Sequence, residues 1–209
     1  MRFRATTLLL VSFLCCMRAF GQNPDDLKNK AIAFLDLSTV ANRVRSAGAK
    51  AQNPTRIQNS SSTPTRQQYL SLYQALTKLQ STRAGYLTNL KLYVDSVKGN
   101  LPLAHRRERL TALEDQVVLL RQGLIVLANA MDPLQISLDI NAPSLSDLIS
   151  DYTLSNQAKV ASTTPGLLET LTLVDLQTLQ SQAINNGKTL HQAIEGLRAF
   201  IKQQYPDIG

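Results

Sequence analysis

The chain has no tryptophan, only two cysteines and only two histidines among its 209 residues. Both cysteines, Cys15 and Cys16, lie close to the N-terminus, and the histidines, His105 and His191, lie in different parts of the chain. Metal sites usually need His or Cys ligands at close spacing, and nucleophilic catalysis needs a base beside Ser, Thr or Cys. We therefore predict no catalytic residue, no metal ligand and no cofactor, and we expect a protein that is not an enzyme.

Residues 1–21 have the three parts of a secretory signal peptide. Arg2 and Arg4 form a basic start, a short apolar run follows, and the small residues Ala19 and Gly21 precede a suitable cleavage site. The apolar run is much shorter than the roughly 20 residues of a membrane-spanning helix, and no later run reaches that length. We expect cleavage after Gly21, an extracytoplasmic protein that is periplasmic or secreted, and no transmembrane segment in the mature chain.

Cleavage after residue 21 would remove Cys15 and Cys16, and the mature chain would then have no thiol. An exported domain without disulfides must be stabilised by an ordinary apolar core. A lipid anchor on one of the two cysteines is the alternative. It is disfavoured because the bulky Phe13 and Leu14 stand where a lipid-anchored signal has small residues.

Charge is distributed unevenly along the chain. Residues 28–131 contain 15 basic and 5 acidic residues, whereas residues 132–209 contain 4 basic and 8 acidic residues. The two halves could neutralise each other, or the basic half could face an anionic partner such as a membrane surface, a cell-wall polymer or a nucleic acid. Nucleic acid is the least favoured of these partners, because no aromatic residue that could stack on bases lies near the densest basic segment.

The most regular apolar pattern spans residues 66–131 and is typical of helices with a coiled-coil-like seam. Gly99 and Pro102 divide the pattern into two helices of about 30 residues, which so short a link must fold into an antiparallel hairpin. Folding at this link places Leu90 opposite Leu110. The seam residues, which follow steps of three and four, are Tyr69, Leu72, Leu76, Leu79, Arg83, Tyr86, Leu90, Tyr93, Val97, Leu103, Arg106, Leu110, Leu113, Val117, Leu120, Leu124, Leu127 and Met131.

Two arginines interrupt the apolar seam of the hairpin. The hairpin register places Arg106 beside Tyr93 and brings Arg83 within reach of Glu114. An arginine over a tyrosine ring makes a modest cation–aromatic contact. We interpret both arginines as pins that hold the two helices together, and not as ligand clamps.

A third helix is expected over residues 27–51, where similar apolar stepping would cover the flank of the hairpin. Residues 53–65, with two prolines and three consecutive serines, are expected to form a flexible loop. We predict an all-α fold: an elongated three-helix bundle within residues 22–131, built on the long antiparallel hairpin.

The C-terminal region, residues 132–209, has a weaker pattern and is expected to form a smaller helical appendage on or beside the bundle. Residues 135–140 alternate like a short strand. Residues 166–185 fit a helix or a strand, with the helix favoured. Thr189 and Gln192 resemble a capping box that would begin a last amphipathic helix.

The densest basic patch lies where the second hairpin helix begins, and Arg106, Arg107 and Arg109 are its candidate partner-contact residues. We expect an exported, non-enzymatic interaction or structural module whose partner is another envelope or extracellular protein. One alternative is a small-ligand-binding sensor or carrier with a pocket between the hairpin and the C-terminal helices. In architecture alone, the expected bundle is similar to the helical minor pilus subunits of bacterial type IV secretion and conjugation machines.

Overall fold

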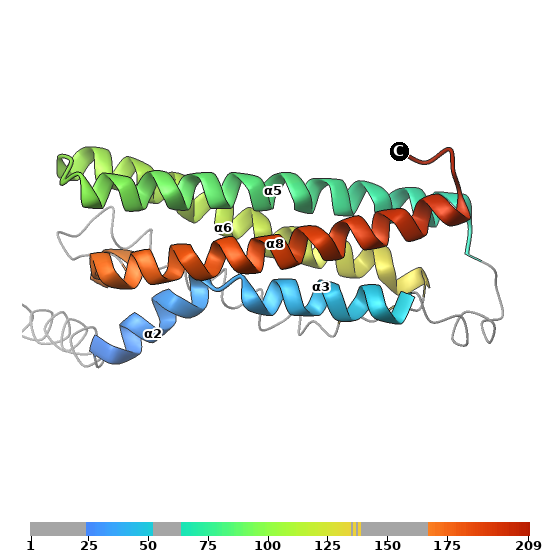
Figure 1. Ribbon diagram of the computed structural model, residues 1–209, viewed down its shortest axis with the longest axis horizontal. Helices are drawn as coiled ribbons and strands as arrows, with labels where there is room; N and C mark the ends of the chain where they lie inside the picture. Colours follow the sequence, from blue (N-terminus) through green and yellow to red (C-terminus); the bar gives the residue numbers. More distant parts are fainter. Residues whose placement is uncertain (1–23, 52–63, 135, 137, 139–166) are drawn as a thin grey trace, which may run out of the picture.

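The computed structural model describes residues 24–51, 64–134, 136, 138 and 167–209 (Figure 1). The elements in these ranges are α2 (Pro24–Leu35), α3 (Ser38–Ala51), α5 (Arg66–Lys98), α6 (Leu103–Met131), η1 (Asp132–Leu134), η2 (Leu167–Thr170) and α8 (Leu173–Gln204). All of them are helical, which confirms the predicted all-α fold class. The signal peptide, nearly all of the predicted loop and most of the predicted strand lie outside the described residues.

The predicted hairpin is confirmed: α5 and α6 run antiparallel and pack against each other along their length (Figure 1). The Gly99 amide donates to the Asp95 carbonyl at 2.8 Å and ends α5. Asn100 then takes a left-handed conformation with φ of 49°, which Asn tolerates better than most residues. Leu90 and Leu110, the predicted partners across the seam, are 0% and 5% exposed.

The C-terminal region is larger than the predicted appendage. A single helix, α8, runs the length of the bundle and packs against both α5 and α3 (Figure 1). The bundle is therefore built from α5, α6, α8 and the α2–α3 segment, and not from three helices with an appendage. The helix alternative for residues 166–185 is confirmed from Leu173 onward.

The cap of α8 also differs from the prediction. Thr172 and Asp175 form a capping box at the start of the helix. The capping box predicted at Thr189 is wrong, because Thr189 lies inside α8 and its hydroxyl donates to the Asn185 carbonyl at 3.3 Å.

The predicted helix over residues 27–51 is two helices, α2 and α3, separated at Asp36 and Leu37. The Ser38 amide donates to one Asp36 carboxylate oxygen at 2.8 Å, and the Ser38 hydroxyl donates to the other at 2.6 Å. Burial raises the pKa of Asp36, but these hydrogen bonds outweigh it and hold the pKa below the ordinary value. The carboxylate therefore stays charged and starts a new helix.

The end of the bundle away from the hairpin link is closed by aromatic packing. The Tyr69 ring lies 6.2 Å from the Phe200 ring and 5.3 Å from the Tyr205 ring, measured between centroids. Arg66 donates from Nε to Asp207 at 3.0 Å and ties the chain end to the start of α5.

The stretch Leu103–Leu134, which contains α6, is long and apolar enough to cross a membrane by length and composition alone. A core helix of a soluble bundle passes the same test, and 44% of this apolar window is buried within the protein. Its buried residues include Leu113, Leu120 and Leu127 on the hairpin seam.

Candidate functional site

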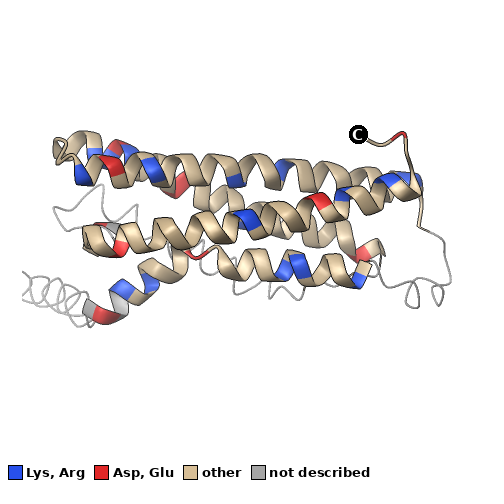
Figure 2. Ribbon diagram, viewed as in Figure 1, with Lys and Arg blue, Asp and Glu red and all other residues tan. Residues whose placement is uncertain are grey.

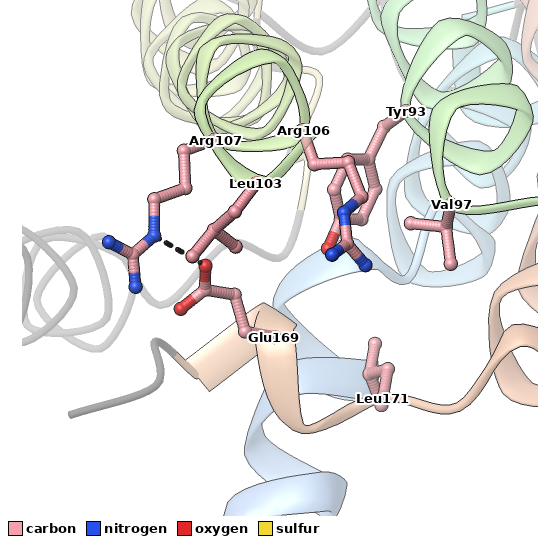
Figure 3. Close-up of a pocket in the computed structure, with 7 residues that line it drawn as sticks. All are labelled: Tyr93, Val97, Leu103, Arg106, Arg107, Glu169 and Leu171. Carbon is pink, nitrogen blue, oxygen red and sulfur yellow. Dashed lines mark hydrogen bonds and ion pairs between the residues drawn. The ribbon is translucent and has the colours of Figure 1, made fainter. Parts of the chain in front are cut away.

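The candidate site lies at the link end of the hairpin, which we call the hairpin tip: the end of α5, the start of α6, and η2 beside them (Figures 1 and 3). Pro102 occupies the N-cap of α6 and offers no side-chain hydrogen bond, and the first turn contains no acidic residue. The N-terminal end of a helix carries a partial positive charge. Basic and acidic residues lie together at this end of the protein (Figure 2).

The structure brings the three predicted contact residues together in the first two turns of α6 and gives each a different environment. Arg106 is half-buried and lines a pocket. Arg107 donates from Nε to the Glu169 carboxylate of η2 at 2.9 Å. Arg109 is exposed. The three cations therefore differ: Arg106 and Arg107 line a pocket, Arg107 is also ion-paired with Glu169, and Arg109 is a surface cation.

The pocket has a volume of about 380 Å³, which is near the lower end of the range for small-ligand sites (Figure 3). It lies between the hairpin and the C-terminal region, where a pocket is expected from the sequence. Its lining residues are Tyr93 and Val97 of α5, Leu103, Arg106 and Arg107 of α6, Glu169 of η2, and Leu171.

Arg106 and Tyr93 lie next to each other in the pocket, as the hairpin register predicts (Figure 3). The Arg106 Nε atom is shielded from solvent and has no hydrogen-bond partner. Burial raises the pKa of Tyr93 to about 12, with a further rise from Glu169, so its hydroxyl stays protonated at neutral pH. Two hydrogen-bond donors therefore line the same cavity.

Arg83, the other arginine of the seam, contacts a different helix from the one predicted. Its Nη1 donates to the Gly187 carbonyl of α8 at 3.2 Å, and its Nε donates to the Gln80 side chain at 3.2 Å. Arg83 therefore joins α5 to α8. The interpretation of Arg83 as a pin between α5 and α6 is not what these contacts show. Arg106 lies beside Tyr93 as predicted, but the cation–aromatic contacts found among the described residues are those of Arg198 and Lys202 with Tyr73.

A second polar cluster, which sequence reasoning missed, lies where α2 ends. Arg121 of α6 is 4% exposed, and its Nη2 donates to the carbonyls of Ala33, Phe34 and Asp36 at 3.0–3.1 Å. Burial lowers the pKa of Arg121, and the Asp36 charge partly offsets this effect. The last carbonyls of a helix have no partner within the helix and attract cations, so Arg121 caps α2.

Tyr86 of α5 completes the cluster around the end of α2. Its side chain is 1% exposed, and its hydroxyl donates to the Leu35 carbonyl at 2.7 Å. Two side chains of the hairpin thus satisfy four carbonyls at the α2–α3 junction. The cluster is a structural site in which Nη2 of Arg121 and the Tyr86 hydroxyl are bonded to the backbone, although Arg121 Nε, like Arg106 Nε at the tip, is buried without a partner.

One sequence signal could have located Arg121. Arg107, Glu114 and Arg121 recur at intervals of seven and so lie on one face of α6, beside the apolar seam. Glu114 and Arg121 are 5% and 4% exposed, and Arg107 pairs with η2. A charged stripe next to a seam indicates a second packing face, which here meets the N-terminal and C-terminal segments.

The two histidines lie on different helices and face different surroundings. His105 is exposed at the start of α6, whereas His191 of α8 shares a hydrogen bond of 2.6 Å with Gln80 of α5. Within the ranges that the structure describes, no group of three or more His, Cys, Asp or Glu residues is arranged to hold a metal ion.

Comparison with protein-family models, with curated proteins and with solved structures finds no match for this chain.

Proposed function

We propose that the protein is an exported, non-enzymatic interaction module that contacts an acidic partner in the cell envelope or outside the cell through its hairpin tip. The observation that carries this proposal is the arrangement of Arg106, Arg107 and Arg109 at one end of an elongated bundle. Clustered cations of this kind raise the association rate of an anionic partner. Their place at a narrow end would let the long body of the bundle remain outside the contact.

The buried chemistry of the bundle supports a role in contact. The other buried arginine, Arg121, is used by the fold itself, because its Nη2 donates to carbonyls of α2 and the α2–α3 junction. His191 is held by Gln80, and His105 is exposed. The proposal therefore assigns function to the tip, where a cation and a hydroxyl line a cavity, and not to the core.

Export is the first part of the proposal that an experiment can test. Its support is the basic start, the apolar run and the small residues before position 22 in the sequence. N-terminal sequencing of the protein from fractionated cells should find Gln22 as the first residue in an extracytoplasmic fraction. A retained first methionine, or a lipid on Cys15 or Cys16, would contradict it.

The contact itself is tested by affinity capture from the envelope fraction with the wild-type protein and two charge-reversal variants. Arg109→Glu changes the exposed cation of the tip, and Arg45→Glu is the matched control on α3, also exposed and away from the tip. We expect the captured partner to be lost with Arg109→Glu, retained with Arg45→Glu, and weakened when salt rises well above about 0.15 M because screening shortens the range of the attraction. The same partners in all four conditions would contradict the proposal.

A small-ligand-binding sensor or carrier is the second candidate, and the pocket of about 380 Å³ favours it. A ligand of this kind would stabilise the folded state by mass action. Heating the protein with and without a low-molecular-mass envelope extract would separate the candidates, because only a small-ligand receptor should melt at a higher temperature in an extract freed of macromolecules.

A further inference from the structure

The hairpin-tip pocket contains more hydrogen-bond donors than the protein can satisfy. Arg106 Nε is buried without a partner, and the Arg106 guanidinium and the Tyr93 hydroxyl form no hydrogen bond with the described residues. Both side chains line the same cavity (Figure 3). Buried donors are nearly always paired. Arg121 Nε and Arg198 Nε are also buried without a partner, so it is the combination of unpaired donors with a cavity that points to a ligand at Arg106.

The residues that line the pocket carry a net positive charge, and the buried Glu114 also acts electrostatically on Tyr93. Arg107 and Glu169 form an ion pair at 2.9 Å on one wall, whereas Arg106 has no such partner. A single negative charge would balance Arg106. A guanidinium can bind either a carboxylate or a phosphate through two parallel hydrogen bonds. A carboxylate suits this site better, because Glu169 would repel the second charge of a phosphate.

The remaining walls of the pocket are apolar. Val97 and Leu103 contribute from the hairpin, and Leu171 contributes from the segment between η2 and α8. Leu101 and Leu103 are 43% and 51% exposed, which is unusual for leucine and leaves an apolar rim at the tip. A rim of this kind is covered by a macromolecule more completely than by a small ion.

We infer that this pocket binds a carboxylate carried next to an apolar side chain on a partner polypeptide, with Arg106 and Tyr93 as the residues that recognise the carboxylate. The inference rests on the proposed contact function and names the chemistry of the partner. The carboxylate accepts hydrogen bonds from the Arg106 guanidinium and the Tyr93 hydroxyl. The apolar side chain covers Val97 and the exposed leucines of the rim.

The test is a titration of the ¹⁵N-labelled protein that follows the Nε–Hε signal of Arg106 by NMR. The probe is a capped pentapeptide with one glutamate between a leucine and a phenylalanine, and its matched control has glutamine in place of the glutamate. A second pair, 3-phenylpropionate and 3-phenylpropionamide, provides the same chemistry without a peptide backbone. We expect the glutamate peptide to shift the Arg106 signal and to bind about tenfold more tightly than the glutamine peptide, because charge-assisted hydrogen bonds are the stronger ones.

Three variants assign the binding to the pocket. Arg106→Gln should weaken the glutamate peptide about tenfold, and Tyr93→Phe should weaken it about threefold, since each removes a donor. Arg45→Gln, which removes an exposed cation of α3 away from the tip, should change the affinity by less than about twofold. Equal binding of the glutamate and glutamine peptides by the wild-type protein would overturn the inference without relying on any variant.

The small acids decide the source of the carboxylate. Binding of 3-phenylpropionate as tightly as the peptide would contradict a polypeptide partner and assign the pocket to a free organic acid. Failure of this inference can be told apart from failure of the proposed function. If capture depends on Arg109 but the peptide leaves Arg106 unchanged, only the pocket inference fails; if the peptide binds but capture ignores Arg109, only the proposed contact at the tip fails.

Discussion

Two arginines of α6, Arg106 and Arg121, differ in the hydrogen bonds that their guanidinium groups make. Arg121 is 4% exposed and donates to three carbonyls at the end of α2 and the α2–α3 junction. Arg106 lies four turns earlier, lines a cavity, and has a buried Nε atom without a partner. A tyrosine of α5 accompanies each of them: Tyr86 donates to the Leu35 carbonyl, whereas Tyr93 has no acceptor among the described residues.

The difference separates a structural arginine from a candidate recognition residue. Burial of a cation costs free energy unless its donors are satisfied. The α2–α3 junction supplies three acceptors for Nη2 of Arg121, so removal of this side chain breaks contacts of the fold even though its Nε has no partner. The hairpin tip does not supply them, so its two donors can gain a partner from another molecule. We therefore expect the same substitution to destabilise the fold at Arg121 or Tyr86 and to change its stability little at Arg106 or Tyr93.

The largest effect is expected for Arg121→Met. Methionine fills much of the space of the arginine stem but removes the Arg121 donor from the carbonyls of Ala33, Phe34 and Asp36. We expect the free energy of unfolding to fall by about 3 kcal/mol or more, measured by urea denaturation. Arg109→Met, on the surface of the same helix, should cost less than about 0.5 kcal/mol. Similar midpoints for the two variants would show that Arg121 does not cap α2.

Leu90→Ala measures how much a buried leucine of the apolar seam contributes to stability, for comparison with Arg121. Leu90 is 0% exposed, so its truncation should cost about 2 to 5 kcal/mol. Leu92, two residues further along α5, is 38% exposed and serves as the control. Leu92→Ala should lower the thermal midpoint much less, and equal losses at the two positions would contradict the assigned seam.

Tyr86→Phe tests the tyrosine that accompanies Arg121. The change removes the hydroxyl that donates to the Leu35 carbonyl at 2.7 Å and leaves that buried carbonyl without this donor, so we expect a loss of about 1 to 2 kcal/mol. Tyr93→Phe is the matched change at the tip, and it should alter the free energy of unfolding by less than about 0.5 kcal/mol because its hydroxyl bonds to no described residue. An equal loss at both positions would remove the distinction between the two clusters.

Much of the hairpin could be predicted from the sequence because its apolar periodicity is strict. The steps of three and four fixed both helices, and Gly99 marked the end of α5. The hairpin register then placed Arg106 beside Tyr93, as the structure shows. The local pattern suffices here because the link between the two helices is short. A short link fixes which residues of α5 lie opposite which residues of α6.

The remaining contacts join segments that are distant in sequence, and no local pattern specifies them. The continuity of α8 through Gly187 depends on α5: the Gly187 carbonyl accepts from Arg83, and a Cβ atom at Gly187 would lie 2.9 Å from Leu87. Tertiary packing thus overrides the low helix propensity of glycine. The acceptors of Arg121 lie 85 to 88 residues away, and the partner of Arg107 lies 62 residues away.

Arg106→Met is the matching substitution at the hairpin tip, and it should change the free energy of unfolding little. The substitution removes a guanidinium that has an unpaired, buried Nε atom, so we expect a change within about 0.5 kcal/mol, or a small gain in stability. The same arginine-to-methionine change at Arg121 should cost several times more. Urea denaturation of the two variants side by side measures the contrast, and a loss at Arg106 equal to that at Arg121 would mean that Arg106 is a structural residue after all.

The smallest effect is expected for the Lys28–Asp175 ion pair between α2 and the start of α8, which joins at 2.8 Å and is partly exposed. Hydrogen bonds from Lys28 and Thr172 lower the pKa of Asp175 to about 2, from an ordinary value of 3.8. A carboxylate with a lowered pKa stabilises the folded state above its unfolded pKa, and this contribution disappears as the pH falls through its folded pKa. The thermal midpoint of Asp175→Asn should therefore lie slightly below that of the wild type at pH 5 to 7, and the difference should close between about pH 4 and pH 2. Lys28→Gln should show the same closing difference, because it removes the other half of the pair. A difference that stays constant down to pH 2 in both variants would assign the effect to packing and not to charge. A loss of stability as large as that of Arg121→Met would contradict the expectation that a partly exposed ion pair contributes less than a buried arginine.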